Sequence, residues 1–207
     1  ATAEMESWWL DRSFGRLPLG GVAVTGENRL TLRASPMTLW HELEPAYLRG
    51  SFSLRSDTRG WVVVEDAGLR ELKPWNAQGH PFHAEGAAYS QEYEIPEPAG
   101  RWTVGLSEWY GSVARVEVNG RLVGRITAPP WECEVPRGLR KGRNTVRVTV
   151  VGTLKNTLGP HHGKQPLGSA WPGMFQAGPK NGPPEGTAYS TVGYGLFAPF
   201  ELRRAGD

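Results

Sequence analysis

The chain alternates apolar and polar residues in short runs, and turn residues separate these runs. In "GRNTVRVTV" (142–150), the valines fall on one face, while Arg147 and Thr149 fall on the other. This pattern is typical of a half-buried antiparallel strand. "VARVEVNGRLVGRI" alternates in the same way on both sides of Asn119-Gly120, a pair that suits the two positive-φ positions of a type I′ turn. We therefore predict a β-hairpin there.

Runs of this kind recur along the chain, and no helical period of 3.6 residues continues over a dozen positions. The strands that we predict are 29–34, 46–56, 60–66, 88–96, 101–107, 113–128 (the hairpin), 131–136, 144–154 and 192–204. Many short strands with tight turns indicate an all-β fold, a two-sheet antiparallel β-sandwich of jelly-roll type.

Residues 155–190 depart from this pattern, because Gly, Pro and Asn crowd around isolated aromatic residues. We predict a long loop, and loops of more than about 15 residues are usually functional or disordered. The 27 Gly, 17 Pro and 9 Trp among 207 residues agree with many turns and few long helices. Nine tryptophans are more than the core needs, so we expect some of them in the loops.

A short pattern occurs twice, in "GENRLTL" (26–32) and "GRNTVRV" (142–148). It indicates either a faint duplication or a common turn-to-strand signature, and the second interpretation is favoured. We expect residues 1–35 to be an N-terminal arm or the end of a preceding domain of the same kind. Residues 36–207 are expected to form the sandwich.

Charge and hydropathy exclude several classes of partner. The formal net charge is +2, and basic residues are spread among acidic ones, so we expect no nucleic-acid binding. No segment approaches the roughly 18 consecutive apolar residues of a membrane span, so we expect no membrane partner. The single cysteine, Cys133, excludes an intrachain disulfide and is expected to be a small buried side chain.

Three motifs, in order, carry a resemblance to a known family. They are a strand that begins with a tyrosine (Tyr89 to Ile95), a "V-x-V-N-G-x-x-V-G" hairpin (Val116 to Gly124) and an "L-x-x-G-x-N-x-V-x-V" return (Leu139 to Val148). With these motifs the chain resembles the sugar-binding, galactose-binding-like jelly-roll domain of family 2 glycoside hydrolases. It is also similar to related accessory domains of large bacterial glycosidases, including rhamnosidase-like enzymes.

The resemblance implies a function. In such enzymes the catalytic carboxylates lie on a separate barrel, which needs roughly 250 residues by itself. It therefore implies a non-catalytic carbohydrate-binding or accessory module of a bacterial glycoside hydrolase, and not an enzyme. The implied partners are a poly- or oligosaccharide and a catalytic glycosidase domain, and a secreted or periplasmic location is favoured over a cytoplasmic one. The alternative is a structural sandwich that packs on a catalytic barrel without binding sugar.

Candidate ligand residues lie in the loops. Sugar sites combine aromatic rings, which stack on the pyranose, with polar groups that bond its hydroxyls. The residues expected to stack on the sugar are Trp75, Trp109, Tyr110 and Trp171. The residues expected to form hydrogen bonds with it are Asn76, His161 and His162. Further polar residues lie nearby in sequence, namely Gln78, His80, His83, Glu108 and Asn156. For any single tryptophan, packing under a loop is favoured. For the histidine pair, a ring that is packed on a loop and bonded to a backbone carbonyl is favoured.

Metal and catalytic sites receive less support. "HPFH" and "HHG" lack the ligand spacing of zinc sites. We expect no cofactor, with a structural calcium ion near Glu65, Asp66 or Glu108 as the alternative. The pairs Glu42/Glu44, Glu92/Glu94 and Glu132/Glu134 each lie on one face of a predicted strand. The favoured interpretation of these pairs is a solvated face rather than a glycosidase dyad.

Overall fold

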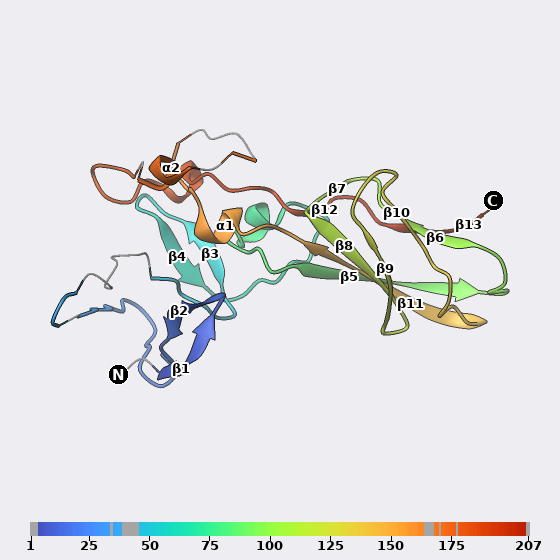
Figure 1. Ribbon diagram of the computed structural model, residues 1–207, viewed down its shortest axis with the longest axis horizontal. Helices are drawn as coiled ribbons and strands as arrows, with labels where there is room; N and C mark the ends of the chain where they lie inside the picture. Colours follow the sequence, from blue (N-terminus) through green and yellow to red (C-terminus); the bar gives the residue numbers. More distant parts are fainter. Residues whose placement is uncertain are drawn as a thin grey trace. The chain divides into compact units, whose positions relative to one another are not determined.

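The computed structural model describes residues 4–33, 35–38, 46–163, 168–169, 171–176 and 178–205. The chain forms two compact units, Ala1–Leu48 and Arg49–Asp207, which we describe separately (Figure 1). No helix among these residues is long and apolar enough to cross a membrane.

The first unit contains one β-hairpin and a small aromatic cluster. Strands β1 (Glu4–Trp9) and β2 (Asp11–Arg16) pair antiparallel. The rings of Trp9, Phe14 and Tyr47 pack on one another at centroid distances of 5.6–5.9 Å. Sequence patterns did not predict this hairpin. They predicted a strand at 29–34 instead, and this prediction is wrong for residues 29–33, which form no strand; residue 34 lies outside the described residues.

The larger sheet of the second unit has the order β5-β11-β8-β9, and all its pairs are antiparallel. Its strands are β5 (Ala87–Ile95), β8 (Val113–Val118), β9 (Arg121–Ile126) and β11 (Gly142–Val151). Between β8 and β9, Asn119 and Gly120 have φ angles of 50° and 79°. The predicted hairpin is therefore confirmed, and the positive φ values explain the choice of Asn-Gly.

A second sheet lies against this one (Figure 1). Its order is β10-β6-β13, formed by β6 (Trp102–Gly105), β10 (Glu132–Glu134) and β13 (Glu201–Arg204). Strands β7 (Trp109–Tyr110) and β12 (Gly195–Leu196) form a short pair beside it. The inward-facing valines of β8 and β11, such as Val116 and Val148, share one buried cluster with Val104, Leu196 and Phe200. The predicted all-β sandwich is confirmed, because one core lies between two antiparallel sheets.

Short elements connect the sheets. They are the hairpin of β3 (Ser53–Ser56) and β4 (Trp61–Val64), the 3₁₀ turns η1 (Trp75–Gln78) and η2 (Gly186–Ala188), and the helices α1 (Lys155–Leu158) and α2 (Pro172–Gln176). The predicted Gly/Pro-rich loop thus contains short helical turns. Free Cys133 is buried, as predicted.

Candidate functional site

Residues 189–196 form an extended segment that we call the strap. Its backbone reaches three other parts of the second unit. The amide of Ser190 donates to the carbonyl of His161 at 2.7 Å, and the amide of Trp75 donates to that of Tyr194 at 2.9 Å. The last two residues of the strap form β12, which pairs with β7. The strap therefore joins η1, β7 and the loop that carries His161 and His162. Most of the predicted site residues occur in these three segments.

Asn156 fixes the middle of the strap. Its side chain is fully buried. Its Nδ2 donates to the carbonyl oxygen of Val192 at 2.8 Å, and the amide of Val192 donates to its Oδ1 at 2.7 Å. One side-chain amide thus bonds both backbone groups of Val192, whose carbonyl also accepts from the amide of Tyr194 at 3.1 Å. This explains the presence of a buried polar side chain on α1.

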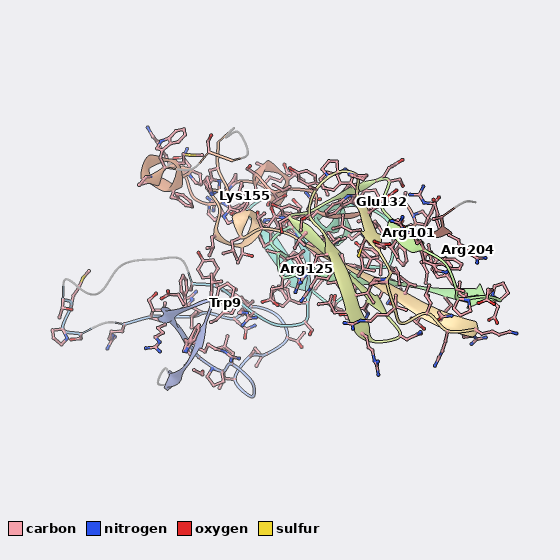
Figure 2. The ribbon with its side chains drawn as sticks, turned by 45° about the vertical axis from the view of Figure 1, so that its right-hand side comes forward. Trp9, Arg101, Arg125, Glu132, Lys155 and Arg204 are labelled. Carbon is pink, nitrogen blue, oxygen red and sulfur yellow. The ribbon has the colours of Figure 1, made fainter. Side chains whose placement is uncertain are left out.

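Lys155 fixes the start of the strap. Its Nζ donates to the carbonyl oxygens of Pro160 and Ser190, at 2.6 and 2.8 Å (Figure 2). Burial lowers the pKa of this ammonium group, because a low-dielectric environment disfavours the charged form. The two carbonyls keep the cation hydrogen-bonded in that environment, so Lys155 links the turn after α1 to the strap.

The two adjacent histidines lie around the ring of Tyr189. His161 packs against Phe82 at 5.1 Å, and its Nε2 lies 2.8 Å from the backbone oxygen of Asn156. Burial lowers the pKa of His161, more than the hydrogen bond to Asn156 raises it, so the neutral ring is favoured. His162 lies 5.0 Å from Tyr189, and both histidines are half-buried. His161 is thus packed on a loop and bonded to a backbone carbonyl.

Trp75 and Asn76 have different environments. Trp75 has an exposed fraction of 0%, and its Nε1 donates to the hydroxyl of Tyr89 at 2.9 Å. We predicted Trp75 as a stacking surface, and the structure corrects this, because a ring enclosed by the core has no face for a ligand. Asn76 is half-buried, and its Nδ2 donates to Oγ1 of Thr191 on the strap at 3.1 Å.

Trp109 and Tyr110 are consecutive in β7 and have different neighbours. Trp109 is half-buried and meets Trp131 edge to face at 5.3 Å. Tyr110 is 45% exposed, and its ring lies nearly parallel to that of Tyr194, with 5.8 Å between centroids and 8° between planes. The hydroxyl of Tyr194 is hydrogen-bonded to that of Thr153. Tyr110 is therefore an exposed ring supported by an anchored one.

Trp171 lies apart from this group in the described part of the chain. It precedes α2 and is 55% exposed. Its backbone amide donates to Sδ of Met174 at 3.3 Å. No hydrogen bond or ring contact among the described residues joins it to the strap. The structure thus brings Asn76, Tyr110, His161 and His162 to the strap, and leaves Trp171 elsewhere.

Sequence analysis did not select the strap residues Tyr189, Thr191 and Tyr194, or Trp131. "AYSTVGYGL" contains both tyrosines, but its apolar and polar residues carry no ligand motif. Their importance comes from long-range contacts. Tyr194, for example, contacts Trp75 and Tyr110, far away in sequence.

A serine, a histidine and an aspartate meet near β3, but their geometry is not that of a catalytic triad. Oγ of Ser53 and Oδ1 of Asp66 both approach Nε2 of His80, at 3.3 and 3.5 Å. A triad needs the nucleophile and the carboxylate on opposite ring nitrogens. Ser53 is also buried, and burial lowers the pKa of His80, more than Asp66 raises it. The group ties β3 to the segments that follow β4 and η1. Gln78 and His83 likewise bond nearby backbone groups.

The described carboxylate pairs take part in surface ion pairs. Glu132 and Glu134 lie 2.8 and 3.1 Å from Arg203 and Arg101 (Figure 2), and Glu92 lies 3.7 Å from Arg143. Glu42 and Glu44 lie outside the described residues. Among the residues described here, no group of three or more His, Cys, Asp or Glu side chains is placed to hold a metal ion.

Comparisons with known proteins return glycosidases. No family model matches the chain, and no curated protein matches it. Among solved structures, a rhamnosidase from Novosphingobium sp. PP1Y matches with a TM-score of 0.45 and 23% identity, over 85% of this chain and 16% of that one.

Two further matches are more distant. A β-glucuronidase from Bifidobacterium dentium matches with a TM-score of 0.40 and 17% identity, over 74% of this chain and 28% of that one. A GH2 β-galacturonidase from Eisenbergiella tayi matches with a TM-score of 0.33 and 18% identity, over 49% of this chain and 17% of that one. The chain therefore spans 16–28% of the length of these enzymes.

Proposed function

We propose that the chain is a non-catalytic accessory module of a glycoside hydrolase, and that its second unit binds carbohydrate at the strap. The observation that carries this proposal is the exposed ring of Tyr110, which lies parallel to Tyr194. A fixed aromatic face is the element that a pyranose ring stacks on, and a rigid ring loses little conformational entropy when it binds. The sequence resemblance to sugar-binding jelly-roll domains supports the same function.

Polar groups near the strap supply the second element of a sugar site. Nδ2 of Asn76 is used by Thr191, while its Oδ1 accepts none of the hydrogen bonds formed in the described part of the chain. His162 presents a half-buried imidazole beside Tyr189. An amide oxygen and an imidazole are both suited to sugar hydroxyls. We propose Tyr110 as the stacking residue, with Asn76 and His162 as hydrogen-bonding residues.

The other predicted contacts have different roles in this proposal. His161 holds the loop of His162 in place, because its ring is bonded to Asn156. Trp109 supports the strand that carries Tyr110. Trp171 stays a prediction as a separate aromatic contact, and Trp75 is left out because it is buried. The module would work beside a catalytic glycosidase domain, which would provide the catalytic carboxylates.

The test is a glycan array on the purified chain, with and without a calcium chelator, followed by titration of any ligand that binds. We expect Tyr110→Ala to weaken binding by at least about tenfold, as is common for a central aromatic contact. Trp8→Ala is the matched control, since it removes a 51% exposed ring that belongs to the first unit. Unchanged affinity in a folded Tyr110→Ala variant would contradict the proposed site.

A second candidate function rests on a different observation. Several large apolar side chains of the first unit are exposed, namely Val22, Val24, Leu30, Leu32 and Met37. Such residues favour a structural domain that packs against a catalytic barrel without binding sugar. A folded chain that binds no glycan on the array would favour this second function.

A further inference from the structure

The two units contain the same asparagine-centred turn. In the first unit, the amide of Val24 donates to Oδ1 of Asn28 at 2.9 Å, and Nδ2 of Asn28 donates to the carbonyls of Val24 and Gly26 at 2.7 and 3.0 Å. In the second unit, the amide of Arg140 donates to Oδ1 of Asn144 at 3.0 Å.

The remaining bonds of the second turn also match. Nδ2 of Asn144 donates to the carbonyls of Arg140 and Gly142, at 2.7 and 2.8 Å. In both turns the accepting carbonyls lie four and two residues before the asparagine. The residue two positions before it is a glycine in both, with a φ angle of 101° (Gly26) or 89° (Gly142), a region that glycine adopts without a steric penalty. The repeated sequence pattern is therefore a repeated structure.

The chain that leaves the two turns has different surroundings. In the second unit it continues along β11, which contains Asn144 and pairs with β5 on one side and β8 on the other. The first two inward positions after Asn144, Val146 and Val148, are 0% exposed. At the equivalent positions after Asn28, Leu30 and Leu32 are 56% and 70% exposed. Residues 29–33 have no strand partner within the described part of the chain.

We infer that residues 24–33 are a turn and an edge strand that a partner polypeptide completes into a sheet. Residues 29–33 dock an antiparallel β-strand of that partner. The turn has the same side-chain hydrogen bonds as the one at the start of β11, and the alternation of Leu30 and Leu32 with polar residues suits a strand that is half buried. An unpaired strand edge accepts an added strand through its backbone groups. The inference does not depend on sugar binding by the second unit.

The sandwich indicates which strand fits. In β5, Glu92 lies opposite Thr145, Ser90 opposite Arg147, and Tyr89 opposite Val148. The equivalent positions of the first unit hold Arg29, Thr31 and Leu32. A strand of the β5 kind would place a carboxylate opposite Arg29 and an aromatic ring opposite Leu32. The pair of opposite charges stabilises antiparallel strands, and the aromatic ring would cover the exposed side chain of Leu32.

A second copy of this chain fits less well. Antiparallel self-pairing about Thr31 would place Arg29 opposite Arg33 on each side. Like charges directly opposite one another destabilise a strand pair. We therefore assign the surface to a strand that carries acidic residues on its outer face.

Disulfide trapping tests this assignment. A T31C variant of the whole chain has one exposed thiol, because Cys133 is 7% exposed and lies in the core. The probe is a synthetic peptide with the sequence of residues 87–95, carrying S90C as its mixed disulfide with β-mercaptoethanol. It is equilibrated with the variant in excess β-mercaptoethanol, so that the T31C thiolate attacks the peptide sulfur and releases β-mercaptoethanol. We expect this peptide to be trapped about tenfold more than a Q91C peptide, whose thiol lies on the opposite face of the strand. An added E92K change should reduce trapping several-fold.

The controls make the outcome decisive. The wild-type chain measures the background from Cys133, and a variant with L30D and L32D added to T31C should lose the preference. Equal trapping of the S90C and Q91C peptides would overturn the inference. A disulfide-linked dimer of T31C chains that outcompetes the peptide would also overturn it, because the occupant would then be a second copy.

Discussion

The sheets of the second unit and the strap beside them are ordered by different interactions. In the sheets, alternating valines such as Val116, Val146 and Val148 are fully buried, while neighbouring strands satisfy the backbone. Along the strap, only the last two residues belong to a strand, and the side chains of Asn156 and Lys155 satisfy its backbone groups. Apolar burial is spread over many residues, whereas the strap depends on a few polar contacts. The strap should therefore be easier to loosen selectively.

The largest expected effect comes from a charge in the sheet core. Val148→Asp would place a carboxylate at a position that is 0% exposed, between β5 and β8. An unpaired buried charge costs several kcal/mol, so we expect a loss of more than about 4 kcal/mol in the free energy of unfolding. Chemical denaturation monitored by tryptophan fluorescence would measure it. Arg147→Gln, on the exposed side of the same strand, is the control and should stay close to wild type.

A smaller and more local effect is expected at the strap. Asn156→Ala removes both hydrogen bonds to Val192. The Val192 amide is left without a partner, while the carbonyl keeps the hydrogen bond from the amide of Tyr194 at 3.1 Å. We expect a loss of about 1–3 kcal/mol, and faster hydrogen exchange at the Val192 amide than in the sheets. Asn76→Ala, which removes one half-exposed bond to Thr191, should cost less than about 1 kcal/mol. Equal acceleration of exchange in β11 and the strap would show that the two regions open together.

Two partly buried histidines, His161 beside the strap and His80 near β3, should make stability depend on pH. Burial lowers the pKa of both His161 and His80, so their neutral forms are favoured in the folded state. Below the ordinary histidine pKa of about 6.5, the unfolded chain binds protons that the folded chain resists. Stability should therefore fall as the pH is lowered from about 7.5 towards 5.5.

Urea denaturation across this pH range checks the prediction, with His161→Gln and His80→Gln as variants. Each substitution should reduce the pH dependence, and the double variant should reduce it most. If the double variant keeps the full wild-type dependence, other groups cause it.

The same difference explains what could be predicted from the sequence. The strands around Val148 and the Asn119-Gly120 hairpin follow from local alternation and turn chemistry, so the sandwich was predictable. The burial of Trp75 and the exposure of Tyr110 depend on Tyr89, Tyr194 and the strap, which are distant in sequence. A periodic pattern carries no information about such contacts. The strand predicted at 29–34 shows the opposite error, since the local signal is present while its partner strands are absent from the described residues.

The smallest effect is expected for the ion pairs on the outer face of the second sheet. Glu134 and Arg101 lie 3.1 Å apart, but their side chains are 56% and 79% exposed. Water screens exposed pairs, and holding two long side chains costs entropy, so Glu134→Gln should change the free energy of unfolding by less than about 0.5 kcal/mol. The measurement is urea denaturation at low and high salt, with Glu132→Gln as the matched variant at the other end of β10. A loss above 1 kcal/mol that disappears at high salt would mean that charges on this face stabilise the sandwich, alongside the apolar core.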